Sequence, residues 1–303
     1  MTSETAAPRG AIGLWWVAAR PKTLWAAVAP VLIGAAMAYA VQPLHIVALA
    51  FTLLGALLIQ IGTNFCNDYA DFKKGADTDD RIGPLRLTQA GLVSPAAMLA
   101  ATVIAFTLAG ACSVYLIARS GWPIAVIGVA SITSGALYTA GPRPLGYMGL
   151  GDLFVLIFFG PVAVGGTYFI QTGALTAPVL LAGFAPGLLS VAILVVNNLR
   201  DIDGDRQAGK RTLAVRFGPG FARAQYLTCV IGAVAITPVL VVWEGRHPAP
   251  VIASVVTLAL SVTPIKTVFC TTAGSALNPI LAATARMLLV YSILFSLGWC
   301  WGT

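Results

Sequence analysis

Residues 45–71 read HIVALAFTLLGALLIQIGTNFCNDYAD, a long apolar run that ends in Asn67-Asp68-Tyr69-Ala70-Asp71. A helix of roughly 20 apolar residues spans the hydrocarbon core of a bilayer. Carboxylates at the end of such a run are costly unless a cation lies near them. The stretch therefore predicts a membrane helix that brings two aspartates to one membrane surface.

Comparable apolar runs recur along the whole chain. Hydrophobic residues make up 58% of its 303 residues, charged residues only 10%, and the mean hydropathy is +0.87, which excludes an ordinary soluble domain. The fold class that we predict is all-α, a polytopic membrane protein with about nine transmembrane helices. A polar or interfacial segment, residues 1–19, precedes a single transmembrane domain, residues 20–303. The predicted spans are 23–41, 45–65, 95–118, 121–140, 152–171, 176–199, 221–243, 248–268 and 281–301.

The distribution of basic residues between the spans predicts the orientation. Of the 18 Lys and Arg residues, 16 fall on the side that holds the N-terminus, and only Arg119 and Arg246 fall on the other. Because cytoplasmic loops collect Lys and Arg, we expect the N-terminus and the long loops to be cytoplasmic and the C-terminus to be outside, in a plasma or inner membrane. The net charge of +7 then reflects these loops, and no nucleic-acid partner is expected.

A second acidic segment, NNLRDIDGD at 197–205, follows the sixth predicted span on the same side. Eight of the eleven acidic residues lie in 68–80 or 201–205. Asp68 and Asp71 are three apart, and Asp201 and Asp205 are four apart, so each pair shares one face if the segment is helical.

These carboxylates indicate a site for Mg²⁺ and a diphosphate. Mg²⁺ takes one or two protein carboxylates and completes its shell with water and phosphate oxygens. One such pair alone would more simply be a solvated, salt-bridged loop, but two copies on one membrane side favour the metal. The neighbouring basic and amide residues are then candidates for binding the substrate. These candidates are Arg20, Asn64, Asn67, Lys73, Lys74, Arg81, Arg86, Asn197, Asn198, Arg200, Lys210 and Arg211.

The motifs resemble those of the UbiA superfamily of intramembrane aromatic prenyltransferases, and in particular its 1,4-dihydroxy-2-naphthoate polyprenyltransferase branch. The likeness runs from about residue 20 to the end of the chain and is specific in the cytoplasmic motifs. These are RPKTL at 20–24, NFCNDYADFKKGAD at 64–77, RIGPLR at 81–86, YTAGP at 138–142 with GLGD at 149–152, and NNLRD at 197–201 through GKRTL at 209–213. The chain departs from the superfamily at Gly75, where many members carry a third Asp. Asp77 is therefore a weaker candidate ligand than Asp68, Asp71, Asp201 or Asp205.

The resemblance implies transfer of a polyprenyl group from its diphosphate to 1,4-dihydroxy-2-naphthoate, with loss of CO₂ and diphosphate, to give demethylmenaquinone. Mg²⁺ is the implied cofactor, and removal of Asp68 or Asp201 is expected to abolish turnover. Tyr138 and Tyr147 are candidates for stabilising the allylic carbocation through their ring faces. Arg20 and Lys22 are candidates for binding the acceptor carboxylate or the diphosphate.

Two alternatives stay open. A prenyltransferase of the same superfamily could use another acceptor, such as 4-hydroxybenzoate or homogentisate, because the sequence does not display the shape of the acceptor site. A transporter for an anionic metabolite would also carry polar residues in its spans, although here the acids cluster at one membrane face. Asp152 is either a helix N-cap or an active-site acid, and the sequence does not separate these roles.

Overall fold

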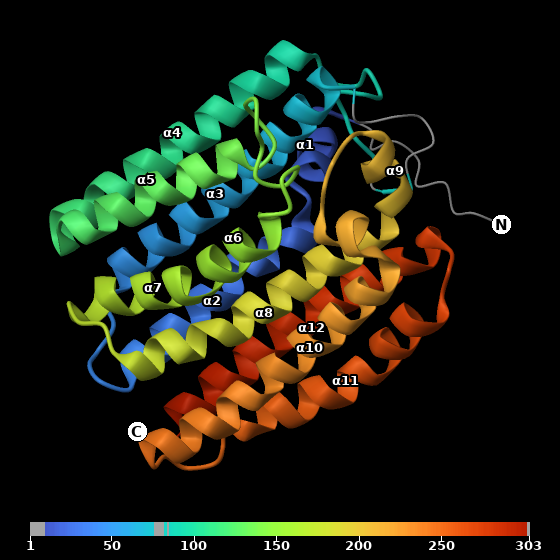
Figure 1. The fold of residues 1–303 in the computed structure, drawn as a ribbon. Helices are drawn as coiled ribbons and strands as arrows, with labels where there is room; N and C mark the ends of the chain where they lie inside the picture. The colour runs from blue at the N-terminus through green and yellow to red at the C-terminus, as the bar shows by residue number, and fades with distance from the viewer. Residues whose placement is uncertain (1–9, 76–81, 84, 302–303) are drawn as a thin grey trace.

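The computed structural model describes residues 10–75, 82–83 and 85–301, and every regular element in these ranges is a helix (Figure 1). Lipid offers no hydrogen-bond partners, so apolar spans satisfy their backbone groups internally as helices. The elements are α1 (Ala11–Ala19), α2 (Pro21–Tyr39), α3 (Ile46–Lys73), α4 (Pro95–Ser120), α5 (Trp122–Leu137), α6 (Gly151–Ile157), the π-helical turn η1 (Phe158–Val162), α7 (Ala163–Thr172), α8 (Ala177–Arg200), α9 (Ile202–Gln207), α10 (Leu213–Glu244), α11 (Val251–Cys270), the 3-10 turn η2 (Gly274–Leu277) and α12 (Asn278–Cys300).

The all-α membrane architecture is confirmed. In the described ranges, eight helical segments are long and apolar enough to cross a membrane, and α5 is a shorter apolar helix. They correspond to the nine predicted spans, with shifted ends. The helix α3 runs to Lys73 rather than to residue 65, so the first acidic segment is helical. The range of α10 begins at Leu213, where Thr212 accepts a hydrogen bond from the Val215 amide. The helix is interrupted at Gly218, whose φ is 82°, so its long part begins close to the predicted residue 221.

The predicted polar or interfacial segment, residues 1–19, contains a short apolar helix in its described part. Residues 11–19 form α1, whose Trp15 ring packs edge-on against Phe65 of α3 at a centroid distance of 5.5 Å. Arg20 joins α1 to α2 with φ of 52°, and it is the one non-glycine residue with positive φ in the described chain. Such a conformation costs of order 1–3 kcal/mol and persists only where surrounding structure enforces it. The chain thus turns sharply at Arg20, directly before Pro21 and Lys22 begin α2.

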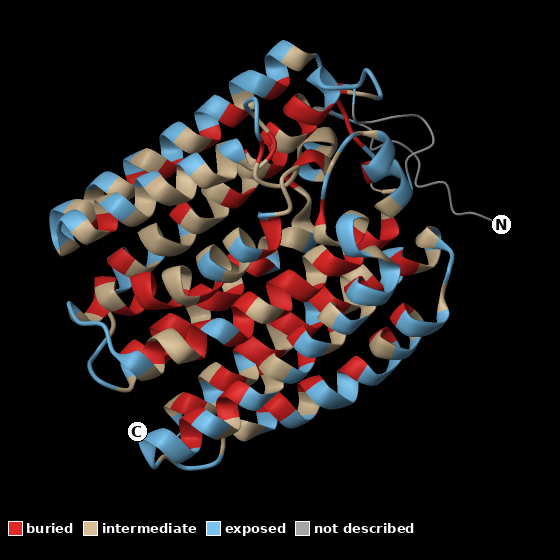
Figure 2. Ribbon diagram, in the orientation of Figure 1, coloured by how far each residue is buried: buried red, intermediate tan, exposed pale blue. Residues whose placement is uncertain are grey.

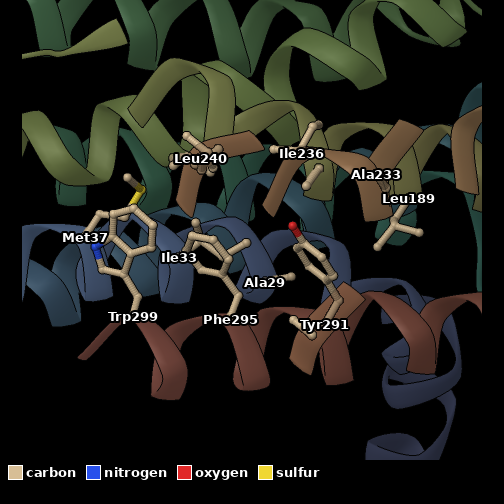
Figure 3. Packing of buried hydrophobic residues seen from close by; sticks show 14 of the residues in the cluster. Ala29, Ile33, Met37, Leu189, Ala233, Ile236, Leu240, Tyr291, Phe295 and Trp299 are labelled. Atoms are coloured by element: carbon tan, nitrogen blue, oxygen red, sulfur yellow. The ribbon is translucent and has the colours of Figure 1, made fainter. Parts of the chain in front are cut away.

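The buried core lies between α2, α8, α10 and α12 (Figures 1 and 2). On α12, the rings of Tyr291, Phe295 and Trp299 follow one another at four-residue spacing, with centroids 6.1 Å and 5.2 Å apart (Figure 3). The Tyr291 hydroxyl is satisfied by a 2.6 Å hydrogen bond with Thr237 of α10. This packing fixes α8, which carries the second acidic segment, against its neighbours.

The fifth span is broken at Gly160, which has φ of −117° and ψ of −115° and precedes Pro161. The break lies where α8 passes very close, since a Cβ on Gly183 would lie 2.6 Å from the Pro161 Cα atom. Glycines allow this backbone contact. The ends of α3 and α8 and the start of α10 gather with α9 at one end of the bundle, while the C-terminus lies at the other end (Figure 1).

Candidate active site

A cavity of about 1310 Å³ opens beside both acidic segments. Most of the predicted site residues line it, which confirms that the fold brings the two segments together. The predicted residues on its wall are Arg20, Lys22, Asn64, Asn67, Asp71, Arg86, Tyr138, Tyr147, Asn197, Asn198, Arg200, Asp201, Asp205 and Lys210. Much of the remaining wall is apolar, with Leu116, Ile124 and Ile170 among its members.

Asp71 is at the centre of the polar end of the cavity, where the two acidic segments meet. The residue is 1% exposed, and its carboxylate accepts hydrogen bonds from Arg86 Nη2 at 3.0 Å and from the Tyr147 hydroxyl at 2.9 Å. Lys210 Nζ lies 3.6 Å from the same carboxylate. Asp71 is therefore held by two cations and a phenol.

Asp68 differs from the expectation that both aspartates of α3 act at the site. It is not among the described residues on the cavity wall. Its two oxygens accept hydrogen bonds from the backbone amides of Leu87 and Thr88, each at 3.1 Å. Residues three apart on a helix are offset by about 60°, so one aspartate points to the following loop and the other to the cavity. Asp68 therefore anchors the loop that carries Arg86.

The second segment lies across a break between helices. Asp201 separates α8 from α9 and holds Arg200 by two hydrogen bonds of 2.8 and 2.6 Å. The Asp205 amide donates to the Asp201 carbonyl at 2.8 Å, so the two residues still lie one turn apart. Asp203 also lies on the cavity wall, and its exposed side chain pairs with Arg206.

Lys210 links the two segments. Its Nζ lies 3.6 Å from both Asp71 and Asp205 and 5.1 Å from the centroid of the Tyr147 ring. Lys74 lies over the same ring at 4.6 Å and donates to the Thr139 carbonyl at 2.7 Å. The Tyr147 ring thus faces two ammonium groups. Its contact with a carbocation stays a prediction.

Burial shifts the pKa of three side chains at the polar end of the cavity. It raises the pKa of Asp205 to about 6, with Lys210 opposing the rise and the charges of Asp201 and Asp71 adding to it. Burial likewise raises the pKa of the Tyr138 phenol, and the charge of Asp152 adds to that rise. The pKa of Lys74 is lowered by burial, against the attraction of Asp71. Removal from water disfavours each charged form.

The remaining predicted residues divide into three groups. Asn64 and Asn67 are partly committed to protein contacts, since Asn64 Nδ2 donates to the Ala19 carbonyl at 2.9 Å and Asn67 accepts from the Thr139 hydroxyl. Lys73, Lys74 and Arg211 do not appear on the cavity wall that the structure describes, and Lys73 and Arg211 are exposed. Asp77 and Arg81 lie outside the described residues.

Four residues with a part in the site were missed by the sequence analysis. Gln225 donates to the Asp152 carboxylate at 2.8 Å, Asn278 accepts from Arg200 at 3.1 Å, and Thr23 accepts from Asn64 at 3.0 Å. Thr139 is the partner of Asn67 and Lys74. Thr23 and Thr139 lie within the motifs RPKTL and YTAGP, although neither was singled out as a candidate. Gln225 is an amide in a largely apolar helix, and such residues hydrogen-bond across helices in membranes.

The described residues contain no group of three or more His, Cys, Asp or Glu that could hold a metal by themselves. Mg²⁺ does not need one, because it is bound through one or two carboxylates together with substrate phosphates. Asp71 and Asp205 already share one cation, the Lys210 ammonium, which shows that carboxylates from both segments reach the same space. The donor set therefore fits a Mg²⁺–diphosphate pair.

The fold and this site define a helical membrane protein that presents two acidic segments to one cavity, and the chain belongs to the UbiA prenyltransferase family, whose model matches residues 27–276. It is 39% identical to a 1,4-dihydroxy-2-naphthoate octaprenyltransferase of Haemophilus influenzae, over 94% of this chain and 95% of that one. It is 40% identical to a protein of the same description from Mycobacterium tuberculosis, over 75% and 77% of the two chains.

The fold is also that of a solved UbiA homolog from Archaeoglobus fulgidus bound to DMAPP and Mg²⁺, with a TM-score of 0.66 at 15% identity, over 93% of this chain and 99% of that one. The protein is thus a multi-pass membrane enzyme of the prenyltransferase class.

Proposed function

We propose that this protein transfers a polyprenyl group from a polyprenyl diphosphate to 1,4-dihydroxy-2-naphthoate, with loss of CO₂ and diphosphate. The product is demethylmenaquinone in its reduced, dihydroxy form, so the reaction belongs to menaquinone biosynthesis. The observation that carries the proposal is the cavity, whose polar end joins two acidic segments and whose wall continues into apolar helices. The relatives described as naphthoate octaprenyltransferases support the choice of acceptor.

The polar end suits a diphosphate. Arg86, Lys210 and Arg200 supply the positive charge that a leaving diphosphate needs, and each is fixed by a carboxylate before substrate arrives. Groups oriented in advance toward developing charge stabilise a transition state without reorganising. We assign Mg²⁺ to Asp71, Asp205 and Asp201, where the bound ion supplies further neutralisation of the leaving group.

The apolar part of the cavity suits the isoprenoid chain. Its wall includes Leu116, Ile124 and Ile170, which lie near the ends of their helices farthest from the acidic segments. Apolar lining keeps water away from an allylic cation, which would otherwise be captured as the alcohol. Following the positive-inside rule, we assign the acidic end to the cytoplasm and the C-terminus to the outside of the cell membrane.

The test is an assay of purified protein in detergent or nanodiscs with a polyprenyl diphosphate and each acceptor in turn. We expect the naphthoate to be prenylated with release of one CO₂, and we expect chelation of Mg²⁺ to stop the reaction. Prenylation of 4-hydroxybenzoate or homogentisate without CO₂ release would instead support another acceptor. Movement of a solute across proteoliposomes, without any prenylated product, would overturn the enzyme assignment.

A further inference from the structure

Asp152 differs from the other aspartates on the cavity wall. Asp71, Asp201, Asp203 and Asp205 each have a Lys or Arg nitrogen within 3.6 Å. Asp152 forms no ion pair with the cations that the structure describes, and its Oδ1 accepts a hydrogen bond from a neutral amide, Gln225 Nε2, at 2.8 Å. A carboxylate accepts about four hydrogen bonds, so this one keeps acceptor capacity.

The structure also separates the two roles that the sequence left open for this residue. Asp152 is the second residue of α6, and no side chain caps that helix. It is 8% exposed and lies on the cavity wall. Asp152 lies in the first turn of α6, where the helix dipole favours a negative charge, but it does not occupy the N-cap position. A buried carboxylate in a membrane helix without a paired cation is still costly, and such residues are commonly functional.

The surroundings place Asp152 next to the polar end but outside its cation network. The Tyr138 hydroxyl packs on the preceding residue, since a Cβ on Gly151 would lie 2.9 Å from it. Tyr138 lines the same cavity as Asp152, Asp205 and Asp71. Farther along α6, Phe154 and Val155 continue the wall as apolar side chains. The space beside Asp152 thus suits an aromatic ring with a polar edge.

We propose that Asp152, oriented by Gln225, accepts a hydrogen bond from a ring hydroxyl of the aromatic acceptor and is a catalytic residue of the transfer. This inference rests on the function proposed above. A hydroxyl that donates to a buried carboxylate carries more negative charge on its oxygen, which makes the ring carbons conjugated with it better nucleophiles. Gln225 acts as a positioning residue, because it touches the carboxylate and not the acceptor.

The electron balance requires no further reagent. The allylic C–O bond breaks and its electron pair leaves with the diphosphate, while a π pair of the ring forms the new C–C bond at the carbon that bears the carboxylate. The bond from that carbon to the carboxylate then breaks, CO₂ leaves, and its electron pair restores the aromatic ring. The hydroxyl proton remains shared between the acceptor and Asp152, so the product is the dihydroxy form and no net proton is transferred.

The test compares Asp152→Asn with Glu244→Gln, which makes the same carboxylate-to-amide change at an exposed position at the far end of α10. We expect Asp152→Asn to lower kcat/KM for the acceptor about 100-fold, the lower range for a group that assists proton-linked steps. Mg²⁺-dependent binding of a polyprenyl diphosphate should stay within about twofold of the wild type, since Asp152 is outside the cation network. Glu244→Gln should leave both unchanged.

A modified acceptor tests whether the effect of Asp152→Asn acts through a ring hydroxyl of the acceptor. The two monomethyl ethers of the naphthoate each lack one hydroxyl donor. With the wild type, one ether should react about as slowly as the natural acceptor reacts with Asp152→Asn, and combining that ether with the variant should add little. If the loss caused by methylation multiplied with the loss caused by Asp152→Asn for both ethers, the proposal would be overturned. Wild-type acceptor kinetics in Asp152→Asn would overturn it as well.

Two controls keep the outcome interpretable. If Asp152→Asn does not fold, Gln225→Met keeps the carboxylate but removes its orienting amide, and we expect KM for the acceptor to rise about tenfold with donor binding unchanged. Equal loss of donor and acceptor binding in Gln225→Met would make the pair structural and overturn the proposal. Failure of the proposed function is recognised separately, because the wild type would then not prenylate the naphthoate at all.

Discussion

The aspartates of the two acidic segments differ in what they contact. In the first, α3 continues unbroken through both residues, so Asp68 and Asp71 point to different neighbours, a loop backbone and the cavity. In the second, the chain breaks at Asp201, and Asp201 and Asp205 both reach the cavity. Similar spacing of acids therefore gives one site residue in a straight helix and two at a helix break.

The largest expected effect comes from Asp71→Asn. This change removes the charge that pairs with Arg86 and Lys210 and the proposed metal ligand of the first segment. We expect kcat to fall by about 10³-fold. Turnover with a naphthoate and a polyprenyl diphosphate measures it, with Mg²⁺ titrated in each variant. Activity within about tenfold of the wild type would remove Asp71 from the centre of the site.

The next effect separates Asp68 from Asp71. In Asp68→Asn, the new side chain would offer one carbonyl oxygen to two buried backbone amides, so the free energy of unfolding should fall by about 2 kcal/mol. Activity should fall only about tenfold, through a displaced Arg86, with no change in the Mg²⁺ concentration that gives half-maximal rate. Denaturant unfolding and Mg²⁺ titrations of turnover measure the two effects. This outcome would revise the expectation that loss of Asp68 abolishes turnover, whereas a raised Mg²⁺ requirement would return Asp68 to the metal ligands.

A smaller effect is expected from pH, through Asp205. Its pKa is raised to about 6, so the apo site binds a proton there that a metal must displace. Mg²⁺ affinity should be full above that pKa and fall as the pH drops through it, by up to about tenfold per pH unit. Mg²⁺ titrations of wild type and Asp205→Asn between about pH 5 and 8 check this. A pH dependence that persists in the variant would assign it to another group.

The smallest effect is expected at Asp203, which pairs with Arg206 where both side chains are more than half exposed. Solvent screens such pairs, so Asp203→Asn should change stability by less than about 0.5 kcal/mol and activity by less than about twofold. Thermal unfolding and the prenyl-transfer assay measure this. A loss of activity of about tenfold would extend the second half of the site to all three aspartates.

Much of the architecture could be predicted from the sequence. Long apolar runs specify membrane helices because each helix satisfies its own backbone in lipid, and the nine runs were located within several residues of their ends. The end of α3 was misplaced because the run of apolar residues stops before the helix does. The helix α1 was not predicted, because a nine-residue run is too short to register as a membrane span.

The sequence predicted the kind of site, but not which contact each residue makes in it. Asp68 and Gln225 illustrate the limit, because each acts through a partner far away in the chain, Leu87 and Thr88 for one and Asp152 for the other. Hydrogen bonds of this sort depend on the direction of a side chain within a packed bundle, which local spacing does not fix.

The sequence alone determined that this is a membrane protein, that its acids gather on one side, and that those acids suit a metal and a diphosphate. These conclusions follow from the cost of placing charge in lipid, which acts on every residue separately. Only the tertiary structure decided that Asp71 and Asp205 share Lys210, that Asp68 anchors a loop, and that Asp152 lies in the cavity without a described cation. Those outcomes depend on how the helices pack, because packing sets which side chains from distant segments meet.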